Sequence, residues 1–508
     1  MSHDPSPFSP RDEALLAARG LSPGEVRRQI ATMAHPPAPA RLVRPCTLGD
    51  GIERLEGAAM ERALARHAVA RDAGRVTAFV PASGAATRMF RELLAVAARP
   101  GELRAAELRE AAAAGDAEAR AVVEWVAALP RFAFDEVLAR ALAARGFDRA
   151  RLAAAGPWRP LLETLLFPGG LDYAALPKAL LAFHRAPEGV RTAFEEHLAQ
   201  SDELLRDAGG EARFHFTVPG AYRAAFEALL VRARGGPWGV TFSEQHPSTD
   251  TIAATPAGAP FRDDAGALVF RPSGHGALLR NLEALGADLL FLRNVDNVAV
   301  ERLSPLVSRW SRALTGLADE LASQAHALRA RLDDSDDATA PEDAVRFVRA
   351  RFVPDFLHGS REALAARLDR PVRVCGMVAN TGEPGGGPFW VHGADGAVTR
   401  QIVESAQVAP EREQRAILAA ATHFNPVFLA CALRDAAGRT RSLEPFVDEQ
   451  AVIVTRKSAN GRELLALEHP GLWNGAMAGW NTVFVEAPID VFNPVKTVFD
   501  LLRPAHQA

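Results

Sequence analysis

The sequence is poor in cysteine and contains no long hydrophobic run. Its three cysteines, Cys46, Cys375 and Cys431, lie far apart, and none belongs to a Cys-x-x-Cys pair. This pattern argues against a disulfide framework or a zinc site and is typical of a reducing compartment. No window approaches the roughly 18 consecutive apolar residues of a membrane span, and residues 1–20 lack the apolar core of a signal peptide. We therefore expect a cytoplasmic protein with no membrane partner.

An excess of charge of one sign is also absent. The 58 Lys and Arg residues nearly balance the 62 Asp and Glu residues, and the net charge is −4. No global field therefore attracts the protein to nucleic acid, and any binding of phosphate has to be local. A chain of 508 residues can bury a large core in one elaborated domain or in several domains.

Lysine is nearly missing, because only Lys178, Lys457 and Lys496 occur among the 58 basic residues. A chain that uses arginine for almost every surface cation leaves its lysines as candidates for positions that require a compact ammonium. Chance retention is the alternative for any one of them. The neighbouring prolines in Pro177-Lys178 and Pro494-Val495-Lys496 favour a functional role for two of them, but not for Lys457. No lysine follows a glycine, which excludes a P-loop.

Strand-like runs with apolar centres recur along the chain and alternate with helical stretches. We expect strands at about 76–82, 213–218, 238–244, 288–295, 371–378, 399–404, 427–433, 451–456 and 482–487. This alternation predicts an α/β fold with a largely parallel central sheet. Residues 1–72 are expected to form a mostly helical N-terminal arm, and helical insertions are expected near 101–160 and 300–368.

The most informative segment follows the first expected strand. It reads Ser83-Gly84-Ala85-Ala86-Thr87-Arg88 and leads into an expected helix from Met89 to Ala97. Small side chains let backbone N–H groups approach a phosphate, a helix N-terminus adds positive potential, and Arg88 supplies a planar cation. A tight turn filled with alanine is the alternative interpretation.

Polar residues also follow several later strands, where ligands of open α/β sheets bind. Gln245 lies in the polar run 243–250, and Gly274-His275-Gly276 forms a second small-residue loop. Asp296 ends an apolar strand between two amides, a position suited to holding Mg²⁺ against phosphate oxygens. The alternative for Asp296 is a turn or helix cap.

Three further candidates lie downstream. Glu383 belongs to the glycine-rich run 380–388, for which a flexible hinge is the alternative interpretation. Glu404 lies near the end of an expected strand, and Asn425 follows an expected helix.

In their order, these motifs resemble the UDP-sugar pyrophosphorylases, especially the UDP-N-acetylglucosamine pyrophosphorylase type. An uncharacterised bacterial family shares the runs Ser-Gly-Ala-Ala-Thr-Arg-Met-Phe and Asn-Thr-Gly-Glu-Pro-Gly-Gly-Gly-Pro. The resemblance extends over residues 76–500 as separate islands. It implies the Rossmann-like nucleotide-diphospho-sugar transferase fold, with a mixed, mainly parallel sheet and helical insertions. The catalytic domain would span 73–410, and residues 411–508 would complete the sugar and phosphate side of the site.

The resemblance also implies a role for each candidate residue. The implied catalytic residues are Arg88, Lys178 and Lys496, and the implied metal ligand is Asp296. The implied nucleotide-binding residues are Ser83, Gly84, Ala85, Ala86, Thr87, Gln245, Gly274, His275 and Gly276, and the implied substrate-binding residues are Glu383, Glu404 and Asn425. The family has glycine at the positions of Ser83 and Ala86 and asparagine at that of His275, which leaves the base and the sugar open.

The implied activity is that of a Mg²⁺-dependent nucleotidyltransferase, which forms a nucleotide sugar and pyrophosphate from a nucleoside triphosphate and a sugar 1-phosphate. A non-catalytic protein that binds a nucleotide or a nucleotide sugar is the first alternative, motivated by the missing glycines. A sugar-transferring enzyme is the second, but it would be expected to carry Asp-x-Asp where the chain has Asp296-Asn297-Val298. The absence of Gly-x-Ser-x-Gly argues against a serine hydrolase. The oligomeric state is not predicted.

Overall fold

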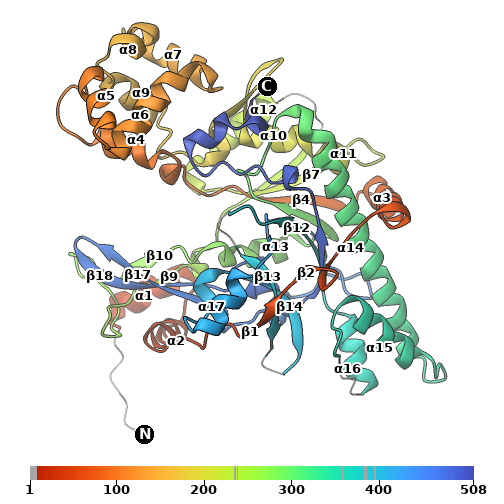
Figure 1. Cartoon of the computed structure of the whole chain (residues 1–508). Helices are drawn as coiled ribbons and strands as arrows, with labels where there is room; N and C mark the ends of the chain where they lie inside the picture. Colours follow the sequence, from red (N-terminus) through yellow and green to blue (C-terminus); the bar gives the residue numbers. More distant parts are fainter. Residues whose placement is uncertain are drawn as a thin grey trace. The chain divides into compact units, whose positions relative to one another are not determined.

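The computed structural model describes residues 8–233, 236, 238–356, 360–382, 386–393 and 396–507 (Figure 1). The chain has an α/β fold with a mixed, mainly parallel central sheet, which confirms the predicted fold class. Across these described ranges, no helix combines the length and the apolar character needed to cross a membrane.

Contacts between residues divide the chain into two compact units, each built from three segments. The first unit comprises Met1–Thr77, Ser243–Leu292 and Ser311–Pro488. The second unit comprises Ala78–Phe242, Arg293–Trp310 and Ile489–Ala508. Each unit therefore joins parts of the sequence that lie hundreds of residues apart.

The first unit contains the longest run of paired strands. Their order is β2 (Thr47–Leu48), β3 (Gly51–Glu53), β19 (Asn481–Glu486), β12 (Val372–Ala379), β16 (Phe428–Ala432) and β11 (Leu289–Arg293). Strands β2, β3, β19 and β12 pair in parallel, whereas β16 runs antiparallel to β12. Strand β12 is buried along nearly its whole length, as expected of a central strand covered on both faces.

The helical insertion expected near 300–368 consists of α14 (Ser304–Asp333), α15 (Ala340–Arg351) and α16 (Arg361–Leu368) (Figure 1). One face of α14 is buried at helical spacing, through Leu314, Ala318, Leu321 and Ala325. At Gly316 a Cβ would lie only 1.7 Å from the carbonyl oxygen of Ala63 in α3 (Gly57–Asp72), so the glycine permits close packing of the two helices.

Two expected strands of the first unit lie outside the central sheet. Strand β14 (Val398–Val403) pairs antiparallel with β13 (Gly387–His392), which also pairs with β1 (Leu42–Pro45). Strand β17 (Ile453–Ala459) forms a hairpin with β18 (Arg462–Glu468). Asn460 and Gly461 between them both have positive φ, the turn that matches the twist of a tight hairpin. The N-terminal arm is also less helical than expected, since it contributes β1, β2 and β3.

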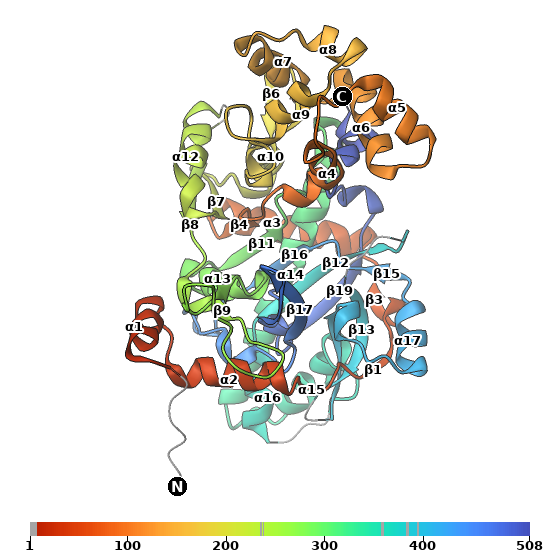
Figure 2. The same cartoon turned by 90° about the vertical axis from the view of Figure 1, so that its left-hand side faces the viewer.

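Helix α2 (Pro23–Ala34) packs against strands β9 (Thr251–Ile252) and β18, and helix α1 (Pro10–Arg19) lies beside α2 (Figure 2). Each helix begins with a serine capping box that satisfies its first backbone N–H groups. Apolar side chains of both helices share one buried cluster with those strands, including Leu16, Val26, Ile30, Ile252 and Leu467. Burial of this cluster attaches the N-terminal helices to the body of the first unit.

In the second unit, β4 (Val76–Pro81), β7 (Ala212–Thr217) and β8 (Trp238–Ser243) lie side by side in that order. The insertion expected near 101–160 forms a helical cluster with α4 (Arg91–Ala97) (Figure 1). Its helices are α5 (Ala105–Ala113), α6 (Ala117–Ala128), α7 (Asp135–Ala144), α8 (Arg149–Ala155) and α9 (Arg159–Leu166). The buried indole rings of Trp125 and Trp158 fill part of this cluster.

Candidate functional site

The loop formed by residues 83–88 follows β4 and is held by a neighbouring segment. The N–H of Ala86 donates to Leu176 O (3.0 Å), and the N–H of Lys178 donates to Gly84 O (3.0 Å). Within the described part of the chain, no hydrogen bond engages the N–H groups of Ser83, Gly84 and Ala85, and these residues are exposed. The loop therefore presents backbone donors to solvent and fixes the backbone of Lys178 beside them.

Arg88 is exposed and forms no ion pair with any residue that the structure describes. The expected helix begins later than predicted, because residues 87–90 form a 3-10 turn and α4 begins at Arg91. The fully buried side chains of Met89 and Phe90 anchor this turn, and Thr87 Oγ1 donates to Ala174 O (2.9 Å). The N-terminus of α4 thus lies beyond the loop rather than at it.

Lys178 meets Asp296 and the C-terminal segment within the second unit. Its ammonium lies 2.8 Å from Asp296 Oδ2 and donates to Val495 O at 2.7 Å. Val495 in turn donates its N–H to Asp296 O at 3.1 Å, so the two segments run side by side. The Lys496 ammonium lies 5.8 Å from the centre of the Phe492 ring. The second unit therefore brings together the 83–88 loop, Lys178 and Asp296, and Lys496 directly follows Val495 in the C-terminal segment.

Asp296 offers a small set of ligands for a metal. Among the described residues, no group of three or more His, Cys, Asp and Glu side chains could hold an ion. Asp296 is a single carboxylate whose Oδ2 already contacts the Lys178 ammonium. Mg²⁺ commonly takes one or two carboxylates and completes its shell with phosphate and water. The residues present thus fit a Mg²⁺ that arrives with a phosphate ligand, and do not fit one held by protein alone.

A second group of candidates lies in the first unit, around His275. The His275 ring stacks on Trp473, with ring centres 3.8 Å apart and planes within 7°. The N–H of Leu472 donates to His275 Nδ1 (2.8 Å), so the proton of the neutral ring is on Nε2. Nε2 lies 3.6 Å from Glu404 Oε1, and Asn474 Nδ2 donates to the same oxygen at 2.7 Å.

These contacts explain the electrostatics of Glu404. His275 is the main cause that lowers the pKa of the Glu404 carboxyl, Asn474 adds to the effect, and partial burial opposes it. Sequence analysis missed Trp473 and Asn474, because the partners of the stack are far apart in the chain and share no spacing signal. The segment that carries His275 can lie this close to the segment that carries Trp473 because residue 276 is glycine. A Cβ on Gly276 would lie 2.2 Å from Pro470 O.

The remaining predicted residues have different surroundings. Gln245 is partly exposed, and its Nε2 donates to Asp250 Oδ1 at 3.0 Å. Asn425 is buried, and its side chain accepts from the N–H of Val427 (3.1 Å), which stabilises a local turn. Its own N–H donates to Gly386 O, and a Cβ on Gly386 would lie 3.5 Å from Glu404 Cγ. Glu383 lies outside the described residues.

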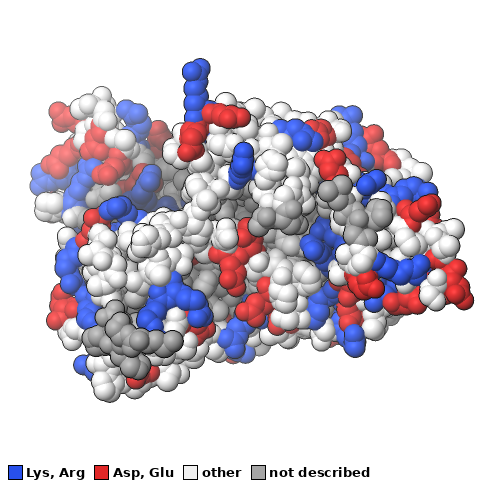
Figure 3. Space-filling model, turned by 90° about the horizontal axis from the view of Figure 1, so that it is seen from below, with Lys and Arg blue, Asp and Glu red and all other residues white. Residues whose placement is uncertain are grey.

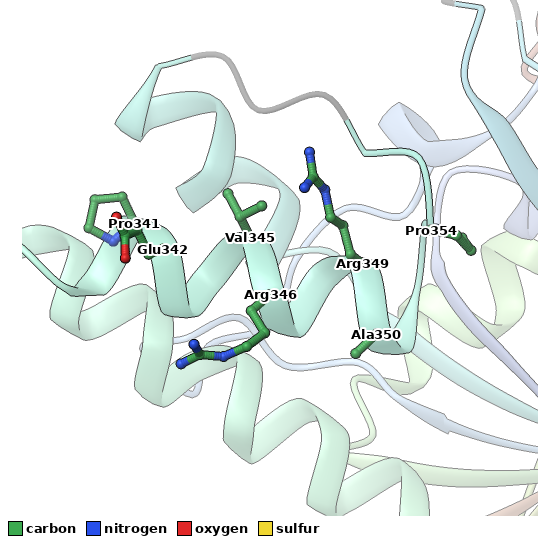
Figure 4. Close-up of a pocket in the computed structure, with 7 residues that line it drawn as sticks. All are labelled: Pro341, Glu342, Val345, Arg346, Arg349, Ala350 and Pro354. Atoms are coloured by element: carbon green, nitrogen blue, oxygen red, sulfur yellow. The ribbon is translucent and has the colours of Figure 1, made fainter.

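A pocket of about 640 Å³ lies elsewhere in the first unit, along α15 (Figure 4). Its lining includes Glu342, Val345, Arg346 and Arg349, and none of the predicted site residues. The labelled side chains leave the helix in several directions and do not converge on one point (Figure 4). We therefore assign no role in the site to this pocket.

Nearly the whole described chain matches one protein family. Residues 9–507 match the family described as "Domain of unknown function (DUF4301)", and the chain belongs to this family. No curated protein matches the sequence significantly.

The fold is similar to that of solved pyrophosphorylases. One is the uridine diphosphate N-acetylglucosamine pyrophosphorylase from Trypanosoma brucei, with 12% identity and a TM-score of 0.51 over 97% of this chain and 79% of that chain. Another is the UDP-glucose pyrophosphorylase from Leishmania major, with 16% identity and a TM-score of 0.34 over 64% of this chain and 61% of that chain. At 12% identity, the likeness to the Trypanosoma brucei enzyme shows a shared fold, and it agrees with the resemblance seen in the motifs.

Proposed function

We propose that the protein is a nucleotidyltransferase that joins a nucleoside triphosphate and a sugar 1-phosphate into a nucleotide sugar and releases pyrophosphate. The observation that supports the proposal is the meeting of the 83–88 loop, Lys178 and Asp296 in the second unit, with Lys496 directly after Val495, whose carbonyl accepts from Lys178. Attack of a sugar phosphate on an α-phosphate needs two anions aligned and their charge neutralised, with no covalent intermediate.

Each of these groups has a defined task in the proposal. The exposed N–H groups of residues 83–85 and the Arg88 guanidinium bind the triphosphate. Lys178 and Lys496 neutralise the charge that develops on the phosphate oxygens. Asp296 would hold Mg²⁺ together with the phosphates, and a bound ion would supply a Lewis acid for the reacting phosphate.

We assign Gln245, Gly274, His275 and Gly276 to the nucleotide, and Glu404, Asn425 and Glu383 to the sugar. The UDP-sugar pyrophosphorylases that the motifs resemble have asparagine where this chain has His275. The identity of the base and of the sugar therefore has to be determined by experiment. Uridine and N-acetylhexosamines are the first to test, because of the resemblance to UDP-sugar pyrophosphorylases.

A non-catalytic binding protein is the second candidate, and one observation favours it. Lys178 and Asp296 neutralise each other through a 2.8 Å ion pair, so a phosphate or a metal has to compete with an internal partner. A binding protein could keep this pair closed, whereas the enzyme has to open it when substrate arrives.

Pyrophosphate exchange separates the two candidates. The reaction exchanges one phosphoanhydride for another, so it is reversible, and labelled pyrophosphate should enter a nucleoside triphosphate when the right nucleotide sugar is present. A panel of nucleotide sugars with Mg²⁺ is tested on the wild type and on Lys178→Met. Exchange that depends on one nucleotide sugar and is lost in the variant supports the enzyme. Tight binding of a nucleotide sugar without exchange across the panel supports the binding protein.

A further inference from the structure

The C-terminal end of helix α1 contacts the loop that carries Gln245. Arg19, the last residue of α1, lies 2.9 Å from Asp250 Oδ2, and its guanidinium lies over the Phe270 ring at 4.5 Å from the ring centre. A Cβ on the following Gly20 would lie 3.5 Å from the Cβ of Ser248. All these residues belong to the first unit.

Asp250 connects Arg19 to Gln245 through its two oxygens. Oδ2 accepts from Arg19 NH1, and Oδ1 accepts from Gln245 Nε2 at 3.0 Å. The side chains of Arg19 and Asp250 are mostly shielded from solvent, with exposed fractions of 32% and 24%. Charge-assisted hydrogen bonds in such a setting hold geometry better than a fully exposed ion pair does.

The chemistry of Asp250 fixes which way the Gln245 amide faces. An ionised carboxylate can only accept hydrogen bonds, so Gln245 has to turn its NH₂ group toward Asp250. Oε1 then faces away from Asp250 and is an acceptor. Such an acceptor suits a base that donates N–H, as the imide of uracil does, and does not suit the ring nitrogen of cytosine at the same position, because that nitrogen also accepts.

We propose that Arg19 and Asp250 are positioning residues that orient the Gln245 amide and so select an imide-bearing base. This gives the N-terminal helix α1 a part in base selection. The inference rests on the proposed function, because it takes Gln245 as a residue that contacts the nucleotide.

The test compares the affinities for UTP and CTP, each with Mg²⁺, by isothermal titration calorimetry on the full chain. We expect Arg19→Gln to lower the preference for UTP over CTP by roughly tenfold, a usual size for coupling within one hydrogen-bond network. Asp250→Asn should act similarly, because an asparagine can present either face of its amide. Arg19→Lys keeps the charge and should restore part of the preference.

Arg262→Gln is the matched control. Arg262 anchors the same helix α1 through Asp12, with NH1 and NH2 bonds of 3.0 and 2.8 Å, but contacts no residue from 245 to 250. The melting temperature of the Arg262→Gln variant measures how much stability is lost when α1 is loosened. Its preference for UTP over CTP should match that of the wild type. Equal losses of preference in Arg19→Gln and Arg262→Gln, or an unchanged preference in both Arg19→Gln and Asp250→Asn, would overturn the inference. Failure of the wild type to bind any nucleotide would instead overturn the proposed function, and this inference with it.

Discussion

Arg88 is an exposed cation that forms no ion pair with any residue in the described part of the chain. Nearby Arg91, by contrast, pairs with Glu92 at 2.7 Å although 81% of its side chain is exposed. An exposed guanidinium that has no partner keeps its donors for a ligand. The 83–88 loop places those donors beside unpaired backbone N–H groups.

We predict that Arg88→Ala weakens triphosphate binding at least tenfold, while the free energy of unfolding changes by no more than about 0.5 kcal/mol, as for most surface substitutions. Titration calorimetry and thermal unfolding measure the two quantities. Arg91→Ala is the control, since it removes another exposed cation at the start of α4. Early melting of Arg88→Ala with normal triphosphate affinity would make Arg88 a structural residue.

Lys178 differs from Lys457 in its surroundings, although both are rare lysines. Lys178 is 15% exposed and contacts two oxygens, whereas Lys457 is 36% exposed and lies 3.6 Å from Glu468. We predict that Lys178→Met lowers turnover on the order of 10²-fold or more, the usual effect of removing one preorganised donor. Lys457→Met should leave turnover close to that of the wild type. Equal turnover of the two variants in the exchange assay would show that the scarcity of lysine carries no functional information.

Sequence reasoning at this scale found the residues that stand in continuous motifs. It singled out the 83–88 loop, Lys178, Asp296 and Lys496, because each follows a strand or lies within two residues of a proline, and their roles stay a prediction. It did not find Trp473, Asn474 or Arg19. Their partners are His275, Glu404 and Asp250, and only the folded chain brings such distant residues into contact.

At the scale of single elements, strand β7 carries a buried histidine, His215. His215 stacks on Phe79 of β4 at 5.5 Å, and its Nδ1 lies 2.8 Å from Thr241 Oγ1 in β8. Burial lowers the pKa of His215 to about 4. The charged form is therefore disfavoured in the folded protein relative to the unfolded chain, where histidine titrates near 6.5.

This shift predicts a pH dependence of stability. Between pH 6.5 and pH 4 the unfolded chain binds the proton and the folded protein does not, so stability falls as the pH falls. One such group contributes a slope of about 1.4 kcal/mol per pH unit. We expect His215→Phe, which keeps a ring against Phe79, to have a shallower slope than the wild type by about this amount. Denaturant unfolding at pH 7, 6 and 5 measures the slopes, and identical slopes would contradict the prediction.

The elements show what a linear pattern can predict. The strands expected at 76–82 and 371–378 are β4 and β12, because their apolar centres are buried. Strands β1, β2 and β3 were missed because they have only two to four residues each, too few for periodicity to appear. The separate sheet of β14 was missed because pairing partners are decided by tertiary contacts rather than by the strand's own sequence.

At the scale of the whole molecule, charge is mixed rather than segregated. The space-filling view shows acidic and basic side chains interspersed on the face that it displays (Figure 3). The net charge of −4 agrees with this distribution. Basic groups that could follow a phosphate backbone do not gather on that face.

We predict that the protein does not bind nucleic acid at physiological salt, because such binding requires several phosphates to be neutralised together. Fluorescence anisotropy of labelled single-stranded and double-stranded DNA at about 0.15 M salt tests this. A nucleoside triphosphate with Mg²⁺ should still bind under the same conditions. Binding of the DNA with a steep dependence on salt would contradict the prediction.

The chain order of the second unit has a consequence for biosynthesis. Residues 78–242 leave the ribosome long before residues 489–508, which supply Val495 and Lys496 and place His506 within 2.8 Å of His184. At about 5–20 residues per second, the delay is roughly 10 to 50 s. During this time the nascent chain exposes apolar surface that Val491, Val495 and Leu501 later cover, and it remains open to chaperones and proteases. Ribosome-bound chains arrested before residue 489 should therefore be cleaved by protease in segment 78–242, and chains extended past residue 508 by a linker should resist.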